Sequence, residues 1–171
     1  MLMQMLAAAG VPPYTDGARE ADASNPEGYL EAEPVMRLAY ESGWLPEADG
    51  HALKVVAPLL PHLPPGPTYR AVLIERDLRE VLRSQEAMLE RNGATAASGA
   101  SLRTAYARYL DAARGWLDRH ASTLMLQHRD VIAAPLRAAG QLHAHLGLDG
   151  DPAVTAAVID PSLHRQRVSD G

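Results

Sequence analysis

The chain has 171 residues, of which 47% are apolar and 22% charged, and its net charge at pH 7 is −5. This length and composition fit a single domain over 1–171 with a real hydrophobic core. The sequence has no cysteine, which excludes disulfides, thiolate metal sites and cysteine nucleophiles. The acidic balance argues against broad binding to nucleic acid.

The first nine residues are strong helix formers that stop at Gly10, and they predict a helix over 1–9. They lack the positive charge of a signal peptide and are too few to span a membrane. We therefore expect a soluble, cytoplasmic chain with no membrane partner. A loop is expected over 11–28, followed by a helix over 33–42 with Pro34 in its first turn.

Two apolar runs in the first half of the chain predict strands. Leu53–Ala57 is predicted as a short buried strand that Pro58 ends. Tyr69–Glu75 is the clearest strand, because its continuous apolar run is typical of strands buried on both faces of a parallel sheet. Between these runs, the five prolines of 58–67 predict a rigid connection.

The second half of the chain alternates helices with one more strand. Asp77 is expected to begin a helix with an apolar stripe, and Glu80 stands at the capping-box position. A flexible loop is expected over 93–100. The remaining predicted elements are a helix over 101–119, a strand over 123–127, and helices over 130–146 and 152–159. Strands that alternate with helices predict the α/β class with a parallel sheet.

An arginine at the end of a strand and a serine on the following helix form a candidate anion site. In open parallel sheets, ligands bind at the carboxyl ends of the strands, where Arg76 is expected. Ser84 falls about two turns into the helix, at the flank of its apolar stripe. A guanidinium and a hydroxyl both donate hydrogen bonds that suit phosphate. The alternative is that Arg76 pairs with a surface carboxylate and Ser84 binds nothing.

The stretch Arg76–Ser84 (RDLREVLRS) resembles the 3′-phosphate-binding segment of sulfotransferases that use 3′-phosphoadenosine 5′-phosphosulfate (PAPS). In that family an Arg ends a strand, a Ser follows eight residues later, and both hold the 3′-phosphate. The resemblance to bacterial members covers nearly the whole chain. The other similar segments are Asn25–Glu31 (NPEGYLE), Lys54–Pro61 (KVVAPLLP), His128–Pro135 (HRDVIAAP) and Asp160–Arg167 (DPSLHRQR).

The resemblance implies a P-loop NTPase-like parallel sheet flanked by helices. The family opens with a strand and a P-loop of the type P-R-S-G-T-S, which lead into a helix like residues 1–9. The sequence contains that helix without the first strand and the P-loop, which normally cradles the 5′-phosphosulfate. We therefore expect poor cofactor binding by these 171 residues, and either a misplaced start codon or a degenerate, N-terminally incomplete domain. The alternative function is a non-catalytic binding or structural protein of the same fold, completed by a partner chain.

The resemblance also implies transfer of a sulfuryl group from PAPS to a hydroxyl or amine of a small-molecule acceptor. Val56 stands where cytosolic members often have a catalytic His, so Asp16 and Glu31 are the candidate general bases. Lys54 is the candidate that stabilises charge on the transferring group. The alternative is that all three side chains are simply solvated.

His128 takes the place of a Tyr that stacks near adenine in related enzymes, and its alternative role is to fill space. No metal is expected, because His143 and His145 are two residues apart, which is the wrong spacing for one helix face, and no third ligand is evident. Apart from the acceptor, the partner considered is a second copy in a homodimer. Nucleic acid is not expected as a partner.

Overall fold

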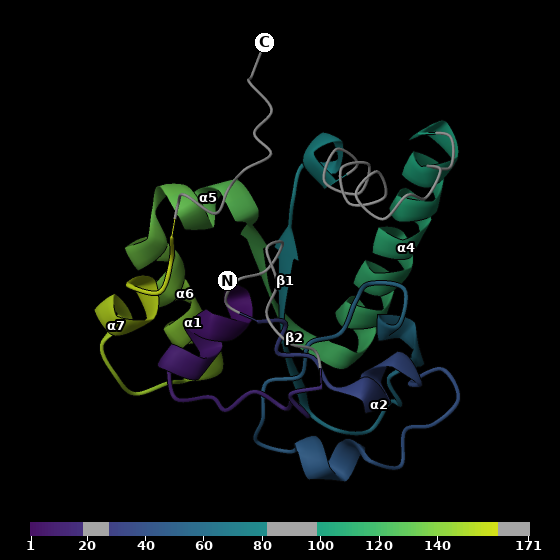
Figure 1. Ribbon diagram of the computed structural model, residues 1–171, viewed down its shortest axis with the longest axis horizontal. Coiled ribbons are helices and arrows are strands. Elements are labelled where there is room, and N and C mark those ends of the chain that lie inside the picture. The colour runs from purple at the N-terminus through teal and green to yellow at the C-terminus, as the bar shows by residue number, and fades with distance from the viewer. Residues whose placement is uncertain (19–27, 82–98, 161–171) are drawn as a thin grey trace.

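The computed structural model of the protein describes residues 1–18, 28–81 and 99–160 (Figure 1). Its strands are β1 (Tyr69–Glu75) and β2 (Ala121–Gln127). Its helices are α1 (Leu2–Ala8), α2 (Glu33–Met36), α4 (Gly99–His120), α5 (His128–Ala133), α6 (Pro135–Leu146) and α7 (Pro152–Ala156), with short 3-10 helices at Leu45–Ala48 and Leu60–His62. None of the described helices is long and apolar enough to cross a membrane.

β1 and β2 form a two-stranded parallel sheet whose register runs from Tyr69 opposite Ala121 to Glu75 opposite Gln127. Parallel strands need a long crossover connection, and α4 runs directly into β2 as part of it. The structure is therefore a mixed α/β protein with a parallel sheet packed against helices. The expected α/β class and the expected parallel pairing are confirmed in this form.

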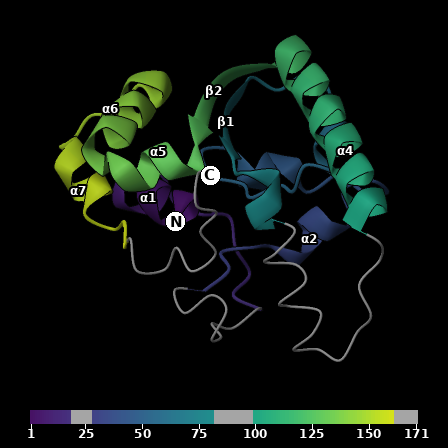
Figure 2. The same cartoon turned by 90° about the horizontal axis from the view of Figure 1, so that it is seen from above.

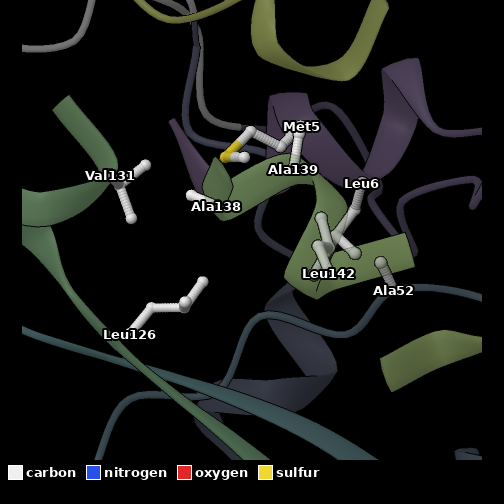
Figure 3. Close-up of a cluster of buried hydrophobic side chains, with 8 residues drawn as sticks. All are labelled: Met5, Leu6, Ala52, Leu126, Val131, Ala138, Ala139 and Leu142. Carbon is white, nitrogen blue, oxygen red and sulfur yellow. The ribbon is translucent and has the colours of Figure 1, made fainter. Parts of the chain in front are cut away.

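Helices cover both faces of the sheet, with α1, α5, α6 and α7 on one side and α4 on the other (Figure 2). Side chains of a strand alternate between its two faces, so each face has its own hydrophobic core. The first core packs against Val72, Ile74 and Leu124, and Figure 3 shows its buried members: Met5, Leu6, Ala52, Leu126, Val131, Ala138, Ala139 and Leu142. The second core contains Trp116 and Leu117 of α4, and Tyr69, Ala71 and Leu73 pack against it.

Several predicted elements are confirmed. The strand over Tyr69–Glu75 has the predicted bounds, and β2 begins two residues before the predicted 123–127. α1 ends just before Gly10, whose φ of +89° suits a residue without a side chain. A helical turn begins at Leu78 after Asp77, whose Oδ1 accepts a hydrogen bond from Arg79 N at 2.8 Å, as an N-cap does.

The predicted strand over Leu53–Ala57 is wrong. Within the described residues, this region forms only one isolated bridge, between Ala52 and Pro13. Ala52 N donates to Pro12 O and Ala52 O accepts from Tyr14 N. The bridge does not extend toward Ala57, because the residues after Tyr14 bond to the segment before α2: Thr15 Oγ1 donates to Glu31 O, and Asp16 Oδ2 accepts from Glu33 N.

Three predicted helices have different bounds. Helix α2 ends at Met36 instead of residue 42, since the next amides bond three residues back, from Arg37 N to Pro34 O and from Leu38 N to Val35 O. The helix predicted over 130–146 is broken into α5 and α6, because Pro135 lacks an N–H and forces Ala134 out of helical geometry. The last helix ends at Ala156 instead of 159.

The loop predicted over 93–100 is also partly wrong, since Gly99 and Ala100 already belong to α4. Residues 93–98 lie outside the described residues.

Candidate functional site

The carboxyl ends of β1 and β2 bring together two segments that are 52 residues apart in sequence. Because Glu75 lies opposite Gln127, Arg76 and His128 occupy equivalent positions just after the two strands. The pKa of Asp77 is lowered chiefly by hydrogen bonds from Arg79 and also by the charge of Arg129. The parallel register therefore places the segments after β1 and β2 side by side.

Arg76 is held by an ion pair with Glu80. Its Nε donates to Glu80 Oε2 at 2.9 Å, and both side chains are mostly buried. The turn that Asp77 caps places Glu80 four residues after Arg76, on the same face. Arg76 therefore lies at the end of the strand as predicted, and it already has a carboxylate partner.

Arg76 can hold an anion only if its terminal nitrogens, Nη1 and Nη2, are not already bonded to protein acceptors. Within residues 1–18, 28–81 and 99–160, Arg76 donates only from Nε, so Nη1 and Nη2 have no protein acceptor there. A guanidinium with both terminal nitrogens open at the end of a parallel strand fits one phosphate. Ser84, the other predicted phosphate ligand, lies outside the described residues. His128 is the first residue of α5, and it is half-buried.

A second polar cluster fixes the same edge of the sheet. Arg114 of α4 donates from Nη2 and Nε to Glu75 Oε1, and Gln127 Nε2 donates to Glu75 Oε2 at 2.8 Å. The hydrogen bond from Arg114 is the main reason that the pKa of Glu75 is lowered. This cluster joins β1, β2 and α4. Sequence reasoning missed it because Arg114 is 39 positions from Glu75 and no local pattern links them.

Two of the predicted catalytic residues, Lys54 and Glu31, meet in the structure. Lys54 Nζ lies 2.9 Å from Glu31 Oε1 and donates to Tyr29 O at 3.1 Å. The ammonium also lies 5.9 Å from the centre of the Tyr29 ring, within the range of a cation–π contact. Leu30, between the two partners, has a φ of +48°, which is unusual for a residue with a branched side chain. The ion pair lines a hollow of about 20 Å³.

Asp16, the third predicted catalytic residue, lies near this pair but is engaged by the backbone. Its Oδ2 accepts from Glu33 N at the start of α2, and its Oδ1 accepts from Ala18 N at 2.9 Å. The hydrogen bond from Glu33 N is the main cause that lowers the pKa of Asp16. A carboxylate with a lowered pKa and both oxygens engaged is a poor proton acceptor. The geometry therefore argues against Asp16 as the base.

The histidines of α6 have structural contacts. His143 Nε2 shares a hydrogen bond with Thr155 Oγ1 at 2.7 Å, which joins α6 to α7. His145 Nε2 donates to Ala71 O at 3.0 Å, and Arg70 Nη1 donates to Leu146 O, so the end of α6 is tied to β1. No group of His, Asp or Glu among the described residues could hold a metal ion.

Comparison with family models, with curated proteins and with solved structures finds no match for this chain. The class that the fold defines is a mixed α/β protein with a two-stranded parallel sheet.

Proposed function

We propose that this chain is a sulfotransferase-like protein of P-loop NTPase-like architecture, and that the carboxyl edge of its sheet holds the 3′-phosphate of PAPS. The observation that carries the proposal is the position of Arg76. It directly follows β1, level with His128 after the neighbouring parallel strand, and its Nη1 and Nη2 have no acceptor within the described part of the chain. Ligands of parallel sheets bind at this edge.

Different residues would bind different parts of PAPS. Arg76 would hold the phosphate through Nη1 and Nη2, while Glu80 fixes the guanidinium through Nε. His128 would stack near the adenine, and Ser84 would donate its hydroxyl to the phosphate, as the resemblance implies.

PAPS supplies the sulfuryl group. Glu31 takes the proton of the acceptor hydroxyl while the acceptor oxygen forms a bond to sulfur. The bond between sulfur and the bridging phosphate oxygen breaks, and 3′-phosphoadenosine 5′-phosphate leaves with that electron pair. Lys54, which contacts Glu31 at 2.9 Å, balances the charge that develops on the transferred group.

Calorimetric titration with 3′-phosphoadenosine 5′-phosphate tests the binding step. We expect Arg76→Ala to weaken binding at least tenfold, because a charge-assisted contact to phosphate is lost. Arg37→Ala is the matched control, since Arg37 also pairs with a Glu four residues away, Glu33, at an exposed position on α2. Equal affinity of the Arg76 variant and the original chain would refute the role of Arg76, and no binding by the original chain would refute the proposal for this chain.

A second candidate is a non-catalytic protein whose sheet is extended by another chain, either a different protein or a second copy. The observation in its favour is that each described strand pairs along only one of its edges, and two strands alone make a marginal sheet. It predicts a dimer or a hetero-complex in light scattering and no transfer of labelled sulfate. A stable monomer would count against it.

A further inference from the structure

The hollow beside α2 is small, and its size limits what can enter it. It measures about 20 Å³ and is lined by Glu31, Ala32, Val35, Met36, Lys54 and Val56. A volume of this order holds about one water-sized group. A hydroxyl can enter it, and the rest of any larger ligand must lie outside on the rim.

The two charged side chains that line the hollow are of opposite sign. Glu31 and Lys54 form a half-buried ion pair at 2.9 Å. A charged head group would be desolvated here without a counter-charge of its own, which is costly. An ammonium has three donors, and Lys54 uses one for Glu31 and one for Tyr29 O. A hydroxyl can accept from the third donor and donate to the Glu31 carboxylate, so it satisfies both partners without adding charge.

The rim of the hollow is apolar and open to solvent. Met36 is 64% exposed and Val56 is 45% exposed, and both line the hollow. Met36 belongs to α2, and Val56 belongs to the segment after Ala52. A polar centre with an exposed apolar border suits a ligand with one hydroxyl and an aliphatic body.

From this arrangement we infer that the hollow binds the hydroxyl of an uncharged, apolar small-molecule alcohol whose aliphatic body covers Met36 and Val56. The inference rests on the proposed function in naming the acceptor class for the Glu31–Lys54 pair. It selects alcohols over amines, because an aliphatic amine is protonated at neutral pH and would meet the Lys54 ammonium.

The test is an NMR titration of the full chain, without nucleotide, using 1-hexanol, hexylamine and hexanoate as probes. We expect hexanol to bind at least tenfold more tightly than either charged probe. Met36→Gln and Val56→Thr should each weaken hexanol binding at least threefold, because each removes apolar contact with the tail. Lys54→Met should remove the discrimination against hexylamine.

The matched controls are exposed apolar residues far from the hollow. Leu136→Gln on α6 corresponds to Met36→Gln, since Leu136 is 59% exposed, and Val154→Thr on α7 corresponds to Val56→Thr, since Val154 is 58% exposed. Equal binding of the three probes, or equal losses in the control variants, would overturn the inference. Because nucleotide is absent from this titration, a chain that binds hexanol but not 3′-phosphoadenosine 5′-phosphate would refute the proposed function alone, and the reverse result would refute only the acceptor class.

Discussion

Replacing Glu75 with glutamine would remove the negative charge that joins β1, β2 and α4 at the edge where the nucleotide is proposed to bind. Glutamine has nearly the same shape and can still accept one hydrogen bond through its amide oxygen. The two donors to Glu75, Arg114 and Gln127, stay in place. The variant therefore changes the charge at this position and little of the packing.

The magnitude follows from how exposed the two charged partners are. The Glu75 side chain is only 16% exposed, whereas that of Arg114 is 45% exposed. Hydrogen bonds to charged groups contribute about 1.5–3 kcal/mol, and fully exposed ion pairs about 0.2–1 kcal/mol. A pair with one buried and one half-exposed partner lies between these limits. We expect Glu75→Gln to lower the free energy of unfolding by about 1–2 kcal/mol at pH 7.

The loss should depend on pH in a defined direction. The folded state lowers the pKa of Glu75, mainly through the hydrogen bond from Arg114, so the charged carboxylate stabilises the fold above the unfolded-state pKa of about 4.3. That stabilisation is lost as the pH falls through the folded-state pKa. The difference between the two proteins should therefore be complete at pH 7 and shrink steadily below about pH 4.

Urea denaturation, followed by the fluorescence of Trp44 and Trp116 in the second core, measures both effects. Glu33→Gln is the control, since Glu33 pairs with Arg37 at an exposed site and should change stability by less than about 0.5 kcal/mol. A loss at Glu75 no larger than that of the control, or one that stays constant down to pH 3, would refute the reasoning.

Two further predictions concern the loops around the Lys54–Glu31 pair. Asp16→Asn should lower the melting temperature at pH 7, because the Asp16 carboxylate, with its lowered pKa, accepts a hydrogen bond from Glu33 N. The difference in melting temperature should shrink below about pH 3.9, where the carboxylate of the unfolded chain becomes protonated. Circular dichroism melts that show the same difference at pH 3 would contradict this prediction. Leu30 has a φ of +48°, a backbone conformation that glycine adopts more easily than alanine. We therefore expect Leu30→Gly to be more stable than Leu30→Ala by about 0.5–1 kcal/mol in urea denaturation. An alanine variant of equal or greater stability would show that this backbone is unstrained.

The parts of the fold that could be predicted are those in which local sequence and tertiary environment agree. The apolar run Tyr69–Glu75 is half-buried and packs against a hydrophobic core on each face, and its predicted bounds are confirmed. Leu53–Ala57 looks similar in sequence, yet it forms no strand, because the residues that follow Pro13 on the opposite segment bond to residues 31–33 instead. No reading of Leu53–Ala57 alone could reveal which segment would lie opposite it.

In the candidate site, too, some contacts could be predicted from the sequence and others could not. The pairing of Arg76 with Glu80 follows from a spacing of four residues across a capped turn, so the sequence carried a usable signal for it. Glu31 and Lys54 are 23 positions apart, and both were candidates from the resemblance, but their contact depends on how the Tyr29–Glu31 turn folds. The opening of the hollow between Met36 and Val56 depends on tertiary packing alone.

The Arg76–Glu80 pair allows the proposed phosphate site to be tested in both directions. A mostly buried guanidinium needs a counter-charge when no anion is bound, and Glu80 provides it. Once a phosphate binds, the Glu80 carboxylate repels it while still fixing Arg76 through Nε. If Arg76 holds phosphate, Glu80→Gln should therefore tighten binding of 3′-phosphoadenosine 5′-phosphate, whereas Arg76→Ala should weaken it. If Arg76 is only the ion-pair partner of Glu80, both variants should lose stability and neither should change the affinity, so calorimetry on the two variants separates a binding residue from a structural one.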